Sequence, residues 1–113
     1  SSKAFSSNLG NCETFHILGS GHLESKSLKI FENGWCDYVF NDDYRLMPLQ
    51  DLKNFIISRK HLPEIKRETE VNETGVNVYE MNKLLLKKIE ELTLYVIAKQ
   101  EELNLIRQKQ KID

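Results

Sequence analysis

The sequence predicts an α+β protein in which short N-terminal β segments precede two helices. Three observations carry this prediction. Ser, Gly and Asn are frequent before residue 34, between short apolar pieces. Pro48 opens a stretch whose apolar residues recur at three- and four-residue spacing. No Gly or Pro interrupts Val76–Asp113, which consists mainly of strong helix formers. We divide the chain into β structure and loops (1–33), a small globular part (34–76) and a long helix (77–113).

Composition excludes several classes of function. The chain has 113 residues, 29% of them charged, which suits one small domain or a piece of a larger chain. Its formal net charge of -1 comes from well-mixed signs, so we expect no nucleic-acid partner. No apolar run approaches the ~20 residues that a membrane-spanning helix needs, so we expect no membrane insertion.

Cysteines and histidines give no metal or cofactor signal. Cys12 and Cys36 are far apart and lack the spacing of metal ligands. The histidines, His16, His22 and His61, are scattered along the chain. We therefore predict no metal site and no cofactor.

Two short strands are predicted, one before residue 34 and one after Trp35. Leu28 and Ile30 alternate with other residues before the turn signal Asn33-Gly34, which is the period of a strand. A second strand-like piece, "DYVF" (37–40), ends at the polar turn "NDDY". The Ser-rich first ten residues have the composition of a disordered terminus.

An amphipathic helix is predicted over about residues 48–59. Pro48 suits the first helical position, and the apolar face consists of Leu49, Leu52, Phe55 and Ile56. Because the residue before Pro63 is forced into extended geometry, the helix must end earlier. We predict a connecting loop, "KHLPEIKRETEVNETG" (60–75), closed by Gly75.

A second, much longer helix is predicted over about residues 78–111, and it carries a heptad pattern. With Ile89 at position a, every position of the a/d seam except Lys99 is apolar over about three heptads, which is near the minimum for a coiled coil. The seam consists of Leu85, Ile89, Leu92, Val96, Lys99, Leu103 and Ile106. Between residues 84 and 97 the helix is apolar nearly all round, so we expect it to be covered on several sides there.

The heptads alone leave the number of strands open. β-Branched residues at a with Leu at d favour a parallel dimer. Leu86 at e and Tyr95 at g widen the apolar stripe toward the larger interface of a trimer.

The stretch Gly34-Trp35-Cys36-Asp37 admits a nucleophile, a metal ligand or a structural hinge. A cysteine nucleophile needs a nearby base or positive charge, whereas Asp37, Asp42 and Asp43 supply negative charge. We therefore predict a hinge. In it Gly34 makes the turn, Trp35 packs on the helix that carries Leu52 and Phe55, and Asp37 caps the turn.

Several motifs in order resemble a known family. "GWCDYVFNDDYRLMPLQDLKNFI", "KHLPEI" and "VNVYEMNKLLLKKIEELTLYVI" together resemble the C-terminal domain of bacterial and phage tail-fibre-like proteins. That domain is similar in layout to the intramolecular chaperone domains of phage tail spikes. The match spans about residues 26–100, so the first 25 would correspond to the end of a fibre shaft.

The resemblance implies a homotrimer whose terminal helices bundle, set the register of three chains and help the upstream shaft to fold. Self-cleaving members of the family use a Ser before an Asp, with a Lys five residues after that Ser. Here Cys36 and Asn41 occupy those positions, so we expect no catalytic residue and no enzyme activity.

The expected function is a structural trimerisation and folding-assistance domain at the C-terminus of a fibre or adhesin. Its partners would be two further copies and the upstream shaft, and its location a virion, a phage-like particle or a bacterial cell surface. Two alternatives stay open. One is a self-processing protease domain, and the other is a receptor-binding tip that touches a host surface receptor through the loop Lys66–Gly75.

Overall fold

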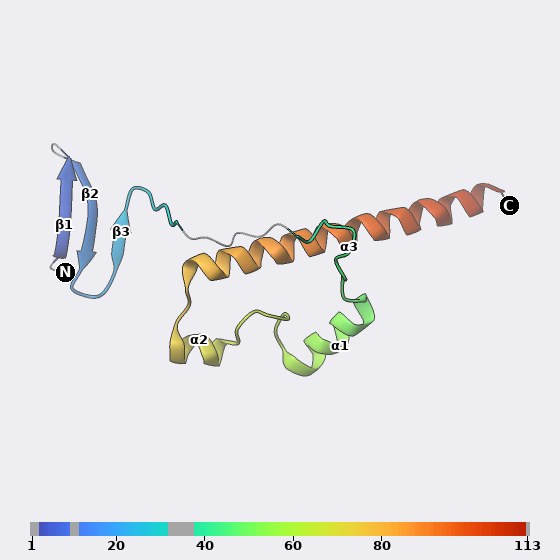
Figure 1. The fold of residues 1–113 in the computed structure, drawn as a ribbon, viewed down its shortest axis with the longest axis horizontal. Helices are drawn as coiled ribbons and strands as arrows, with labels where there is room; N and C mark the ends of the chain where they lie inside the picture. Colours follow the sequence, from blue (N-terminus) through green and yellow to red (C-terminus); the bar gives the residue numbers. More distant parts are fainter. Residues whose placement is uncertain (1–2, 10–11, 32–37, 113) are drawn as a thin grey trace. The chain divides into compact units, whose positions relative to one another are not determined.

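The computed structural model describes residues 3–9, 12–31 and 38–112. Its elements follow the order β1 (Lys3–Leu9), β2 (Cys12–Leu18), β3 (Leu23–Ser25), α1 (Leu49–Arg59), α2 (Glu68–Thr74) and α3 (Val78–Ile112) (Figure 1). The chain divides into two compact units, residues 1–31 and 32–113. The predicted α+β class, the amphipathic helix and the long C-terminal helix are thus confirmed.

The first unit is a three-stranded antiparallel sheet in the order β1-β2-β3. β2 is the central strand, and its His16 lies opposite Ser6 on one side and Glu24 on the other. The turn between β2 and β3 is closed by the amide of Gly21, which donates to the carbonyl of Leu18 at 2.9 Å. Gly21 has a φ of +90°, a conformation that favours glycine.

One prediction for this unit is wrong. The strand predicted around Leu28 and Ile30 is absent, since residues 26–31 lie in no strand and Phe31 is 86% exposed. The sheet instead includes Lys3–Leu9, from the Ser-rich first ten residues. The physical reason is pairing: a strand is stabilised by its neighbours, and the alternation of residue types does not show whether a neighbour exists.

Residues 38–44 form turns where the sequence predicts part of a strand. The amide of Asn41 donates to the carbonyl of Tyr38 at 3.1 Å, and that of Tyr44 to the carbonyl of Asn41 at 3.0 Å. Asn and Asp favour turns because their side chains compete for backbone hydrogen bonds. The turns bury Val39, which is 3% exposed.

Helix α1 begins and ends close to the predicted bounds. Pro48 is its N-cap, and the amide of Leu52 donates to the Pro48 carbonyl at 3.0 Å. The helix ends at Lys60, which adopts a left-handed φ of 63° and donates its amide to the carbonyl of Ile56 at 2.8 Å. None of the side chains of α1 is buried.

The segment predicted as a loop contains the short helix α2. Glu70 accepts a hydrogen bond from the amide of Arg67 at 3.5 Å, which satisfies one donor at the helix start. Gly75 ends the helix at φ 73° and ψ -171°, a conformation that is almost confined to glycine. The prediction missed α2 because "ETEVNET" has Val71 as its single apolar residue and shows no period.

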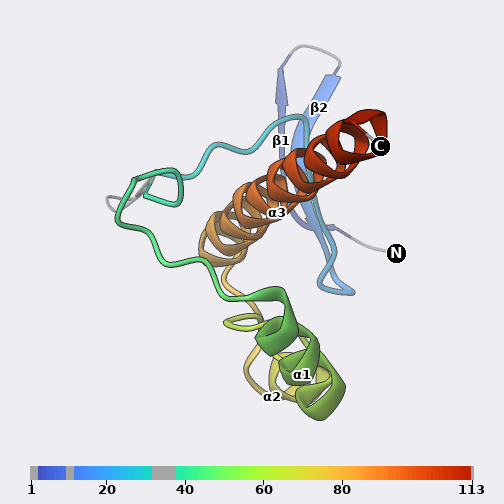
Figure 2. The same cartoon turned by 90° about the vertical axis from the view of Figure 1, so that its right-hand side faces the viewer.

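Helix α3 is uninterrupted over Val78–Ile112. Asn77 caps it, since its side-chain oxygen accepts from the amide of Glu80 at 3.0 Å. In both views of the second unit, α1 and α2 lie on the same side of α3 (Figures 1 and 2). Among the residues whose burial is described, the buried hydrophobic side chains are those of Val39 and Tyr79. The described part of the second unit therefore has a very small core.

Candidate self-association surface

The apolar seam residues of α3 all lie exposed on the single chain. Their exposed fractions run from 46% at Leu85 to 61% at Leu92. The set consists of Leu85, Ile89, Leu92, Val96, Leu103 and Ile106. Since these side chains recur every three or four residues, they form one continuous stripe along α3, which we call the seam.

The other apolar residues of α3 between positions 84 and 97 divide into two groups. Leu84, Leu94 and Tyr95 are half-buried by the rest of the second unit, whereas Leu86 and Ile97 are exposed. The rest of the second unit thus covers α3 at Leu84, Leu94 and Tyr95, whereas the seam, Leu86 and Ile97 are exposed on the single chain.

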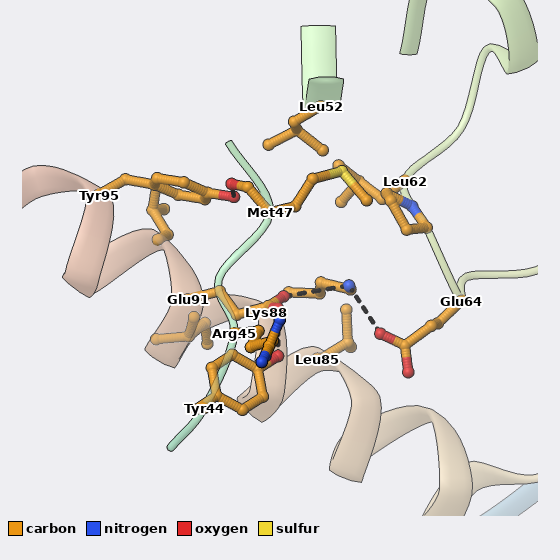
Figure 3. Close-up of a pocket in the computed structure, with 13 residues that line it drawn as sticks. Tyr44, Arg45, Met47, Leu52, Leu62, Glu64, Leu85, Lys88, Glu91 and Tyr95 are labelled. Atoms are coloured by element: carbon orange, nitrogen blue, oxygen red, sulfur yellow. Dashed lines mark hydrogen bonds and ion pairs between the residues drawn. The ribbon is translucent and has the colours of Figure 1, made fainter. Parts of the chain in front are cut away.

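A hollow of about 560 Å³ lies beside the seam. Met47, Leu52, Leu62 and Pro63 form one wall, and α3 forms the opposite wall with Leu85, Ile89, Leu92 and Tyr95. Figure 3 shows Met47, Leu52 and Leu62 facing Leu85 and Lys88 across this space. We call it the α1–α3 groove. Because three seam residues line it, the groove and the seam are one continuous apolar surface.

Two tyrosines hold residues 44–47 against α3. The hydroxyl of Tyr95 donates to the carbonyl of Met47 at 2.5 Å, and that of Tyr44 donates to the carboxylate of Glu91 at 2.5 Å. Desolvation by burial raises the pKa of Tyr44, and the hydrogen bond and the charge of Glu91 raise it further. Both tyrosines thus remain hydroxyl donors at neutral pH.

An ion-pair cluster holds the loop after α1 against the same helix. The carboxylate of Glu64 accepts from Lys87 at 2.7 Å and from Lys88 at 3.1 Å, and Lys88 also pairs with Glu91 at 3.1 Å. Burial acts to raise the pKa of Glu64, but the hydrogen bonds and charges of the two lysines outweigh it and lower that pKa. Glu64 itself has a φ of +72°, which is strained for a non-glycine residue.

The sequence did not single out any of these tethers. Glu64 belongs to a segment with the pattern of a loop, and Tyr44, Lys87 and Glu91 are polar residues among many others in the sequence. The contacts that tether residues 44–64 to α3 join residues 23 to 48 positions apart in the chain. The heptad pattern predicts only which residues of α3 form the seam, so it does not predict the groove wall formed by residues outside α3.

Lys99, the one polar seam position, is exposed and pairs with Glu102 at 3.0 Å. This pair runs along α3 from residue i to i+3. Each chain therefore carries a counter-charge next to its seam lysine.

Other predicted sites add little chemistry. The turn residues Gly34, Trp35 and Asp37, with Cys36, lie outside the described residues. Glu24 contacts the imidazole of His16 and lies 3.7 Å from that of His22. No group of three side chains in the described ranges is suited to bind a metal ion. In the same part of the chain, no helix combines the length and apolarity needed to cross a membrane.

Comparison with protein-family models, with curated proteins and with solved structures gives no match for this chain. The tail-fibre resemblance therefore depends on the motifs quoted above.

Proposed function

We propose that this domain is a homotrimerisation and folding-assistance module of a fibre or adhesin. The observation that supports it best is the uncovered seam of α3, whose apolar residues are 46–61% exposed. A continuous apolar stripe of this kind marks an association surface, because soluble proteins seldom expose large apolar patches. The heptad spacing makes another copy of the same helix its natural partner.

The trimer is favoured over the dimer by the width of the exposed surface. Leu86 extends it on one side of the seam, and the α1–α3 groove extends it on the other. A third helix can cover such additional area, as the tail-fibre resemblance implies. The parallel arrangement sets three upstream shafts side by side and in register, on a virion, a phage-like particle or a bacterial surface.

Folding assistance follows from the physics of association. A shaft of interleaved strands has mostly non-local pairing, so it folds slowly. Three helices that associate early raise the local concentration of the shafts attached to them. The proposal requires no catalysis, and the absence of a Lys five residues after Cys36 agrees with a non-enzymatic role.

Light scattering coupled to size exclusion tests the proposal. A trimer of the 13.2 kDa chain has three times that mass, about 40 kDa. Leu92→Asp should release the monomer, because it places like charges around one axis. Leu105→Asp is the matched control, since Leu105 is as exposed as Leu92 but lies at position c, outside the seam.

A wild-type mass of 13.2 kDa at micromolar concentration would remove the trimerisation function. A dimer mass would agree with a coiled coil but would exclude the trimer. Equal dissociation by both substitutions would show that the seam is not the interface. Mass spectrometry of the same samples should give the uncleaved chain, whereas a fragment beginning at Cys36 would favour the self-processing alternative.

A further inference from the structure

We infer that the α1–α3 groove of each chain is an intermolecular site, filled by the neighbouring copy's α3 through the side that bears Leu86 and Ile97. This inference depends on the proposed self-association and adds to it a specific arrangement. The seam alone defines a bare helical bundle. With the groove filled, the part of each chain that contains α1 also contacts the α3 helix of the next chain.

The groove lies on one flank of the seam only. Lys88 and Tyr95, which line it, occupy heptad position g. On the opposite flank, Leu86 at position e and Ile97 at position b are exposed. Each chain therefore presents two different surfaces. One is the flank that bears the groove, and the other, which we call the ridge, is the flank with Leu86 and Ile97.

Parallel coiled coils bring these two flanks together. In such an assembly the g flank of one helix faces the e flank of the next, so each groove faces a neighbour's ridge. The contact joins two different surfaces and closes when the rotation brings the last copy back to the first. In a closed ring of copies, every groove and every ridge is in contact with a neighbour.

Charge in this register is complementary. Residues at g face those at e five positions later on the neighbour, which sets Glu102 opposite Arg107. Near the groove the facing residues at position e are Leu86, Thr93 and Gln100, none of which is charged. Uncharged side chains at these positions suit a groove whose walls are mainly Leu, Ile, Met, Pro and Tyr. In a parallel second copy the paired g and e positions thus bring no like charges together.

The exposed surface is large enough to accommodate such a partner. The chain exposes 9590 Å². Two separately compact units of 31 and 82 residues would expose about 7,500 Å² together, so about 2,000 Å² per chain is in excess. A standard interface buries about 800 Å² per partner, and a ring gives each chain two neighbours.

Disulfide cross-linking between separately marked chains tests the inference. All chains carry Cys12→Ser and Cys36→Ser. One chain adds Leu62→Cys in the groove wall, and a second, mass-tagged chain adds Leu86→Cys on the ridge. After joint refolding and mild oxidation, a mixed disulfide between tagged and untagged chains can only be intermolecular. We expect this product in the assembled fraction.

Two controls define the outcome. Gln50→Cys replaces Leu62→Cys as an exposed α1 position that does not line the groove, and it should give no mixed disulfide. Val96→Cys, in the seam, reports on the coiled coil by itself. Leu52→Cys, from the same groove wall, repeats the test if Leu62→Cys lowers the helical circular dichroism.

The possible results separate the two proposals. A seam disulfide without a groove disulfide from either wall position would overturn the inference and leave the trimerisation function standing. A 13.2 kDa mass without a seam disulfide would overturn both. Mixed disulfides of equal yield from Gln50→Cys and Leu62→Cys would also overturn the groove site, since contact there would not be specific.

Discussion

At the scale of single residues, Glu64 connects the loop after α1 to helix α3. Its ion pairs with Lys87 and Lys88 reach across 23 and 24 positions of the chain. The side chain is 44% exposed, so solvent screens these pairs and each contributes modestly. Their importance lies in geometry, because they hold Leu62 and Pro63 in place as a wall of the groove.

The lowered pKa of Glu64 predicts how stability depends on pH. A carboxylate whose folded pKa lies below the unfolded value, about 4.3 for Glu, contributes stability above that value. The contribution is lost as pH falls through the folded pKa. Glu64→Gln should therefore lower the melting temperature at pH 7, and the difference from wild type should shrink below about pH 4.3.

Thermal melts at fixed protein concentration from pH 7 down to about pH 3 measure this difference. Glu73→Gln is the control, because Glu73 is an exposed carboxylate on α2, away from the groove residues. Its melting curve should follow that of the wild type. A constant difference between Glu64→Gln and wild type over the whole range would show that the ion pairs do not stabilise the fold.

At the scale of elements, Gly75 joins α2 to α3 and fixes where α3 begins. Its φ of 73° strains any other residue, although no neighbouring atom lies within 4 Å of an added Cβ. Gly75→Ala should therefore destabilise the fold by about 1–3 kcal/mol through the backbone alone. Chemical denaturation measures this value. The stability of the control Asn72→Ala, at an exposed position within α2, should stay within about 0.5 kcal/mol of wild type. Equal stabilities of Gly75→Ala and wild type would show that the backbone at Gly75 is not strained by a side chain.

The seam contains a second test at this scale. Lys99 interrupts the apolar stripe between Val96 and Leu103. Lys99→Leu removes three like charges from a trimer axis and adds a buried leucine, which contributes about 1.5–3 kcal/mol per chain. We expect a higher melting temperature, an altered number of strands, or both. Calorimetry and light scattering measure these quantities, and a lower melting temperature at unchanged mass would contradict the seam.

The sequence predicted the elements that carry their own local signal. Pro48 and the spacing of Leu52 and Phe55 located α1, and the unbroken run of helix formers located α3. Helix α2 and strand β1 were missed, because α2 has no apolar face and β1 depends on pairing with β2. Local composition does not report such tertiary dependence.

The candidate site divides in the same way. The seam follows from heptad spacing, which is a property of one helix. The groove depends on Met47, Leu62 and Glu64, which reach α3 only through the path of the chain between the helices. No period in the sequence encodes that path, so the wall of the groove emerged only with the structure.

At the scale of the whole molecule, the described part of the second unit has too small a core to be stable as a single chain. Val39 and Tyr79 are its buried hydrophobic side chains among the described residues. The last turns of α3, from Lys99 to Lys111, are exposed throughout. An isolated helix of this kind is only marginally stable in water. Folding and association should therefore occur as one transition.

Such coupling makes stability depend on protein concentration, because association draws chains out of the unfolded state by mass action. We expect the melting temperature to fall steadily over a dilution of about 100-fold, and the helical circular dichroism to be lost together with the assembled mass. Leu105→Asp, outside the seam, should show the same dependence. Leu92→Asp should show none, since it is already dissociated and weakly helical. The opposite result would be a wild-type melting temperature that stays constant on dilution, with the helical signal retained at 13.2 kDa. It would mean that α3 is stable in the monomer and that the fold does not depend on association through the seam.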